Sequence, residues 1–72
     1  MKANEVVKSI MGEKGITQGE LTKMINMKSQ SGVSGALNRD MKTSTLVRFL
    51  DVMGCQLIIR DENTGNEYRI AE

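Results

Sequence analysis

The spacing of apolar residues changes near residue 55, and this change most constrains what the chain can fold into. Up to residue 53, apolar side chains recur every three or four positions, which is the period of an amphipathic α-helix. From residue 55, "CQLIIR" and later "EYRI" alternate at every second position and are enriched in β-branched residues, which is typical of strands. The sequence therefore predicts a mainly α fold of four short helices followed by a C-terminal β-hairpin.

Capping and turn residues divide the helical part. Thr17 and Glu20 have the S/T-x-x-E spacing of a capping box, in which each side chain bonds the other residue's backbone amide. Asn4 is suited to cap the first helix, Gly15 can close it in the left-handed conformation, and Asn26 tolerates this conformation after the second helix. The helices are expected at about residues 4–14, 18–25 and 30–38 (capped by Ser29), and from Thr43 or Ser44 to Gly54.

The hairpin is expected at about residues 55–60 and 66–70, with Gly65 at positive φ in the turn "DENTGN". A two-stranded hairpin is marginally stable in water, so it should pack on the helices or pair its edge with another chain. Residues 1–54 and 55–72 are interpreted as a helical bundle and a hairpin of the same domain. Tyr68 is expected to be half-buried.

The residue types present exclude several classes of site. The chain of 72 residues has one Cys and no His, so an internal disulfide, a zinc site and a histidine-activated nucleophile are not expected. We expect no cofactor and no metal, and an enzyme is disfavoured because a chain of this size has little room for a pocket of about 300 Å³ or more. Without a signal peptide or an apolar run of membrane length, the chain is interpreted as cytoplasmic, with no membrane partner.

Charge and methionine are distributed unevenly. Residues 1–48 contain eight Lys or Arg and four acidic residues, whereas residues 49–72 contain two and five, giving +4 and −3. This split favours one surface for a polyanion and another for a different partner. Six methionines suggest either an adaptable peptide-binding surface or plain packing. Packing is the preferred interpretation, because Met11, Met24 and Met53 fall on the apolar helical stripes.

The segment "KSQSGVSGALNRD" at residues 28–40 is a poor helix former by composition. Val33, Ala36 and Leu37 keep helical spacing, yet Gly32 and Gly35 each cost a helix about 1 kcal/mol relative to alanine. A helix that lies in the DNA major groove, which is about 12 Å wide, benefits from a slim outer face with short polar side chains. Together with residues 18–25, the segment therefore indicates a helix-turn-helix motif.

At residues 5–54 the chain resembles the phage Cro/repressor (XRE-type) family of helix-turn-helix regulators. The matching stretches are "TQGEL" and "MI" in the first motif helix, "SQSGV" opening the second, and "LNRDMKTSTLVRFLDVMGC" after it. The spacing from Leu21 to Val33 is one residue longer than usual in the family, so the recognition register is counted back from Val33. Thr22 and Asn26 replace the usual Ala and Gly.

The resemblance implies a sequence-specific transcriptional regulator, repressor-like, that binds double-stranded DNA as a homodimer. It implies base contacts for Gln30, Ser31 and Ser34, although the first two could instead be solvated residues of the helix start. Phosphate contacts are implied for Gln18, Lys28, Asn38, Arg39 and Lys42.

Some small regulators and antitoxins of this type add a strand that pairs between subunits, and the hairpin resembles such a strand. The predicted dimer interface consists of Leu57, Ile58, Ile59, Tyr68 and Ile70. The alternative is a protein-interaction module on the same fold, such as an antitoxin or a phage-encoded inhibitor that binds a toxin or other protein through the acidic hairpin.

Overall fold

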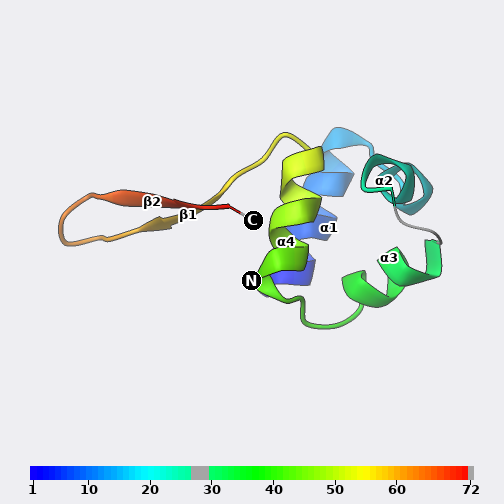
Figure 1. The fold of residues 1–72 in the computed structure, drawn as a ribbon, viewed down its shortest axis with the longest axis horizontal. Helices are drawn as coiled ribbons and strands as arrows, with labels where there is room; N and C mark the ends of the chain where they lie inside the picture. Colours follow the sequence, from blue (N-terminus) through cyan, green and yellow to red (C-terminus); the bar gives the residue numbers. More distant parts are fainter. Residues whose placement is uncertain (27–29, 72) are drawn as a thin grey trace.

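The computed structural model describes residues 1–26 and 30–71, which form four α-helices followed by an antiparallel hairpin (Figure 1). The elements are α1 (Ala3–Lys14), α2 (Gln18–Met24), α3 (Gln30–Leu37), α4 (Thr43–Val52), β1 (Leu57–Arg60) and β2 (Glu67–Ile70). The molecule measures 42 × 22 × 20 Å, because the hairpin projects from the helical bundle along the longest axis. The predicted mainly α fold with a terminal hairpin is confirmed.

The core lies entirely between the helices. Phe49, Leu21, Leu37, Val7 and Val33 are its largest fully buried side chains. Every helix contributes to this cluster, and the predicted inward positions on α3 are confirmed. Met11 and Met53 are buried as expected, but the core prediction for Met24 is wrong, because its side chain is 41% exposed.

The capping and turn residues predicted from neighbouring positions in the sequence are confirmed at both ends of α2 and at the end of α1. The Thr17 hydroxyl accepts from the Glu20 amide at 3.1 Å, and the Thr17 amide donates to Glu20 Oε1 at 3.1 Å. This amide bond is the main reason why the pKa of Glu20 lies below its ordinary value. Gly15 and Asn26 have the predicted positive φ, 67° and 57°.

Two predicted N-caps are wrong. α1 begins after Lys2 and α4 after Lys42, and neither cap residue makes a side-chain cap bond. Asn4 lies inside α1, where its amide bonds a distant carbonyl instead, and Thr43 is already the first residue of α4. Two helices end one residue early: Ile25 has the C-cap conformation, and α3 stops before Asn38. The Ser29 cap lies outside the described residues.

Gly54 directs the chain from the bundle into the hairpin. Gly54 follows the end of α4 as expected and has a left-handed φ of 76°, and the Cys55 amide then donates to Leu50 O at 2.8 Å. Cys55 and Gln56 form this connection, so the first strand begins two residues later than predicted, and the second begins one residue later.

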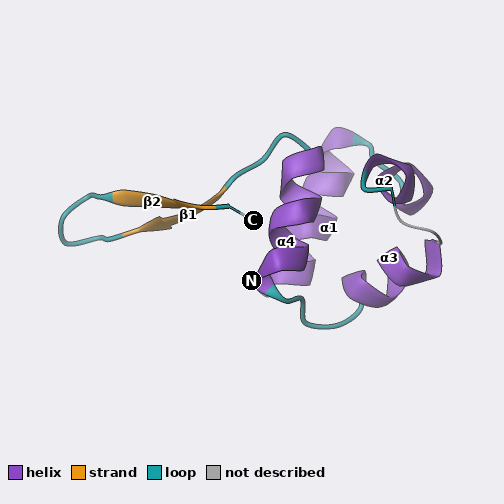
Figure 2. Cartoon of the chain, viewed as in Figure 1, coloured by secondary structure: helices purple, strands orange, loops and turns teal. Residues whose placement is uncertain are grey.

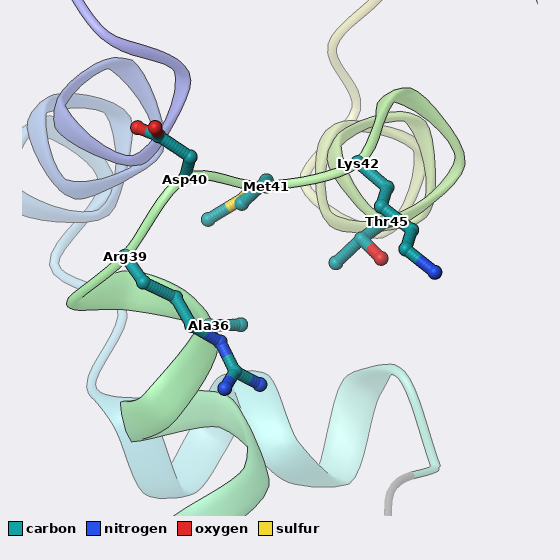
Figure 3. Close-up of a pocket in the computed structure, with 6 residues that line it drawn as sticks. All are labelled: Ala36, Arg39, Asp40, Met41, Lys42 and Thr45. Carbon is teal, nitrogen blue, oxygen red and sulfur yellow. The ribbon is translucent and has the colours of Figure 1, made fainter.

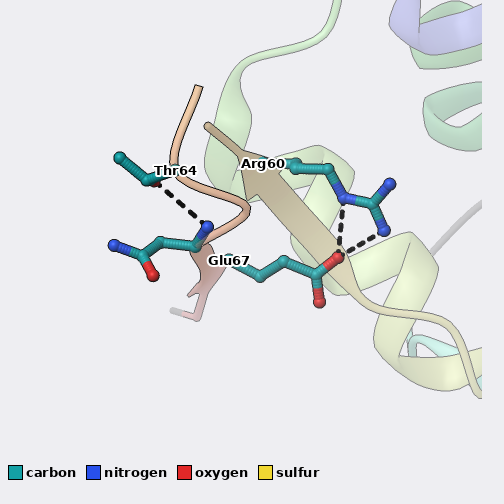
Figure 4. A network of polar contacts seen from close by, with 4 residues as sticks. Arg60, Thr64 and Glu67 are labelled. Atoms are coloured by element: carbon teal, nitrogen blue, oxygen red, sulfur yellow. Dashed lines mark hydrogen bonds and ion pairs between the residues drawn. The ribbon is translucent and has the colours of Figure 1, made fainter. Parts of the chain in front are cut away.

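The hairpin has a defined register and an acidic turn. Leu57 pairs with Ile70 and Ile59 with Tyr68, so these four side chains share one face. On the opposite face, Arg60 donates twice to Glu67 Oε2, at 2.9 and 2.7 Å (Figure 4). The turn is closed by a bond from the Gly65 amide to Asp61 O at 2.8 Å, with Gly65 at φ 77° as expected.

The prediction that Tyr68 is half-buried is wrong: its side chain is 56% exposed. The reason is that the hairpin projects from the bundle, so the helices do not cover its outer part. Among the described residues, no strand residue belongs to the core cluster.

Candidate nucleic-acid interface

The two helices of the predicted motif pack together at the end of the molecule opposite the hairpin (Figure 2). Leu21 of α2 and Val33 and Leu37 of α3 are fully buried in the shared core. Because α3 also contacts α1, it is supported from two sides. This arrangement leaves the segment with the poorest helix propensity held by tertiary packing.

The C-terminal end of α3 is held by polar contacts from α1. Asn4 Nδ2 donates to Leu37 O at 3.1 Å, and Lys8 Nζ donates to Asn38 Oδ1 at 3.3 Å. The side-chain amide of Asn38 in turn donates from Nδ2 to Ser34 O at 2.8 Å. The bonds to Leu37 O and Ser34 O satisfy carbonyl groups that a helix end otherwise leaves without partners.

A shallow pocket of about 280 Å³ lies where α3 passes into α4 (Figure 3). Arg39 and Lys42 line it together with Ala36, Asp40, Met41 and Thr45, and the Asp40 carboxylate points away from the Arg39 guanidinium. Within residues 1–26 and 30–71, neither cation forms an ion pair with a carboxylate. The pocket therefore has two positive charges available for an external anion.

The start of α4 lies beside this pocket, because its N-cap residue Lys42 and Thr45 of its first turn line it. Lys42 is the N-cap residue and provides no side-chain acceptor, so no side-chain cap satisfies the first amides of the helix. The helix dipole places a partial positive charge at the same point. Two cations and a helix N-terminus thus converge at the junction of α3 and α4.

The predicted site residues are only partly described. Lys28 lies outside the described residues, and for Gln30 and Ser31 only the backbone at the start of α3 is described. Ser34 is half-buried on α3, and Gln18 is the half-buried first residue of α2. Asn38 is exposed, but its side-chain amide already has partners within the chain. The structure therefore brings Arg39 and Lys42 together and engages Asn38 internally.

Sequence reasoning missed three contributors. Asn4 and Lys8 reach α3 from more than 29 positions away in the sequence, and no local pattern indicates such long-range contacts. Thr45 lines the pocket because it lies one turn into α4, close to the predicted phosphate-binding residues. A prediction that started the fourth helix at Thr43 would have placed Thr45 in its first turn, three residues after Lys42.

The residues of the predicted dimer interface are largely uncovered. Ile58, Ile59 and Tyr68 are 44%, 53% and 56% exposed, and Leu57 and Ile70 are half-buried. Beside them lies an apolar groove of about 470 Å³. It exceeds the pocket volume of about 300 Å³ for which a chain of this size was expected to have little room. The groove exists because the projecting hairpin leaves a face of the bundle open.

Comparison of the chain with protein-family models, with curated proteins and with solved structures gave no match. In the part of the chain that the structure describes, no helix combines the length and the apolar character needed to cross a bilayer. The same residues contain no group of three or more Cys, Asp or Glu side chains arranged to hold a metal ion.

Proposed function

We propose that this protein is a sequence-specific DNA-binding regulator of the Cro/repressor type that acts as a homodimer. In this proposal α3 enters the major groove, and α2 crosses the groove mouth. Gln30, Ser31 and Ser34 meet base edges, while Arg39 and Lys42 bind the phosphates beside the groove.

The observation that carries the proposal is the junction of α3 and α4. Arg39, Lys42 and the uncapped start of α4 present positive charge next to a short helix of small, polar residues. Backbone amides at a helix N-terminus are suited to bind phosphate oxygens, and cationic side chains supply most of the affinity for DNA. Double-stranded DNA, which has an anionic backbone and exposes its base edges in the grooves, is the partner that matches both features.

Titration of duplex DNA at several salt concentrations tests this proposal. If each subunit makes roughly two to four cationic contacts, the dimer neutralises about 4–8 phosphates, and log K should fall against log salt with a slope of about −4 to −7. The measurement is fluorescence anisotropy with labelled duplexes. A flat salt response would contradict phosphate binding.

We assign the dimer contact to the hairpin. Ile59 and Tyr68 form a cross-strand apolar pair that is uncovered in the single chain, and each strand has one unpaired edge. Replacing Ile59 with Lys should give a monomer in sedimentation velocity, whereas Ser9→Lys, which adds the same charge at an exposed position of α1, should remain a dimer. An I59K variant that remains a dimer would contradict the assignment.

A second candidate function is a protein-interaction module that uses the hairpin to bind a toxin or another protein. The exposure of Ile58, Ile59 and Tyr68 favours it, because apolar side chains gathered on a surface often mark protein contacts. A gel shift with random-sequence DNA, beside a pull-down that compares wild type with I59K, separates the two. DNA binding by wild type supports the regulator, whereas protein capture by wild type but not by I59K, without DNA binding, supports the interaction module.

A further inference from the structure

An apolar groove lies between α1 and α4 beside the point where the hairpin leaves the bundle. It has a volume of about 470 Å³, which exceeds that of the pocket at the α3–α4 junction. Its main apolar walls are Val6 and Ile10 of α1, Leu46 and Leu50 of α4, and Leu57 and Ile58 at the hairpin root. The groove is thus continuous with the proposed dimer contact but extends into the bundle.

The outer part of the hairpin carries an apolar ridge, formed by Ile59 and Tyr68, that occupies no groove of its own chain. The register places Ile59 and Tyr68 directly opposite each other, on the face that also holds Leu57 and Ile70. Figure 1 shows the hairpin pointing away from α1 and α4, so this ridge lies beyond its own groove. One chain therefore exposes both an apolar ridge and an apolar groove.

We propose that the groove between α1 and α4 receives the Ile59–Tyr68 ridge of a second copy of the chain. This inference rests on the hairpin-mediated homodimer of the proposed function and adds the bundle surface that completes it. In a two-fold dimer, each hairpin fills the partner's groove while its own groove is filled in return. A second copy supplies ridge and groove in equal number, so both exposed apolar surfaces are buried at once.

The area that a stable dimer needs favours this arrangement over contact between hairpin edges alone. A standard interface buries about 800 Å² per copy, which is roughly a sixth of the 5054 Å² accessible surface of the chain. Each strand has four residues and spans about 13 Å, so pairing one strand edge covers only a small part of that area. Docking in the groove adds Val6, Ile10 and Leu46 to the buried surface.

The distribution of charge also favours a second copy of the chain as the occupant of the groove. Residues 55–72, which include the hairpin, carry a net −2, with Asp61 and Glu62 in the turn, whereas residues 1–54 carry a net +3. A hairpin lying across the partner's groove brings its acidic turn over a bundle of opposite charge. Lys2, the N-cap residue of α1, and Lys14, its last residue, are both exposed near the α1 residues that line the groove. Complementary charge of this kind steers association and fixes orientation.

The first test compares two lysine variants of α1 in the full-length chain. Val6→Lys places a charge in the groove, and Ser9→Lys adds the same charge at an exposed position of the same helix, outside the groove lining. We expect V6K to raise the dimer Kd in sedimentation equilibrium by about tenfold or more, because docking would bury an unpaired charge. S9K should stay within about twofold of wild type. An equal Kd for V6K and wild type would overturn the groove contact.

The second test detects the contact directly and does not depend on a variant that folds. Equal amounts of ¹³C-labelled and unlabelled chain are mixed, and an isotope-filtered NOE experiment records contacts between copies only. Because the sequence has one Tyr, the ring signals of Tyr68 are unambiguous. We expect intermolecular NOEs from this ring to the methyl groups of Val6 and Ile10.

The outcomes separate the inference from the function on which it rests. Intermolecular NOEs confined to strand residues would overturn groove docking and leave the hairpin dimer standing. A monomeric sample, or NOEs from Tyr68 to Val6 within one copy only, would overturn both the docking and the dimer. DNA binding is measured separately by titration and is decided by neither result.

Discussion

Asn4 Nδ2 donates a hydrogen bond of 3.1 Å to the backbone carbonyl of Leu37, and this bond joins the first turn of α1 to the last residue of α3. The side-chain oxygen of Asn4, Oδ1, is buried and has no partner among the described residues, so the side chain acts here as a donor. The position of the proposed recognition helix therefore depends on a residue 33 positions away.

Replacing Asn4 with Asp should destabilise the fold, because it removes this donor and places a negative charge against the Leu37 carbonyl. We expect the free energy of unfolding to fall by about 1–3 kcal/mol. Glu5→Gln, a change at the exposed neighbouring position, should cost less than about 0.5 kcal/mol. Urea denaturation followed by circular dichroism measures both. Equal stability of N4D and E5Q would show that the bond contributes nothing.

Gly35→Ala should stabilise the fold but weaken DNA binding. A Cβ at this position would meet only the Nη2 atom of Arg39, at 3.9 Å, so alanine fits and should stabilise the helix by about 0.5–1 kcal/mol. Against DNA, the added methyl group lies beside Arg39 on the surface that should approach the groove wall. We expect affinity to fall by about fivefold or more, as for other overpacked contacts.

Gly12→Ala is the matched control for this change. Its Cβ would meet nothing within 4 Å, and it lies on α1, away from the proposed interface. It should stabilise the chain by a similar amount and leave DNA affinity unchanged. If G35A binds DNA as well as G12A does, the glycine is not needed for groove entry. Thermal melts and anisotropy titrations give the two quantities.

Arg39→Ala and Gln30→Ala should affect DNA binding in different ways. Loss of Arg39 should weaken binding to all sequences and make the log–log salt slope of the dimer shallower by about 2, since one phosphate contact is lost in each copy. Loss of Gln30 should reduce discrimination by about 1–3 kcal/mol at one base position. Binding to a panel of single-base operator variants distinguishes them. Identical profiles would show that the assigned register is wrong.

Glu20 should make stability depend on pH in a defined direction. The Thr17 amide lowers the pKa of this carboxyl below its ordinary value of 4.5, so its contribution is complete above that value and is lost as pH falls through the lowered pKa. Glu20→Gln keeps a capping side chain without the charge. The advantage of wild type over E20Q in the free energy of unfolding should therefore shrink below pH 4.5. A constant difference between pH 7 and 3 would contradict this.

Local signals in the sequence predicted most of the fold. The period of apolar residues identified all four helices and both strands, and the capping box of Thr17 and Glu20 was correct in both bonds. Glycines with positive φ were predicted where the chain turns. These features depend on neighbouring residues only, so they can be read without knowledge of the tertiary structure.

The errors concern residues whose partners are distant. Asn4 was interpreted as a cap, although its amide bonds Leu37, and Met24 was assigned to the core from its period alone. The open hairpin could not be inferred either, because its direction depends on how Gly54 and the Cys55 amide end α4. The groove between α1 and α4 follows from that direction and so was not expected.

Selection of bound sites from a random pool of duplex DNA tests the central proposal most directly, since it reports specificity and dimer geometry together. We predict enrichment of a two-fold symmetric sequence whose half-sites are centred about 10 base pairs apart, the spacing that two recognition helices about 34 Å apart would match. A pool that emerges without an enriched sequence, at an ionic strength low enough for binding, would contradict the proposal that α3 reads DNA.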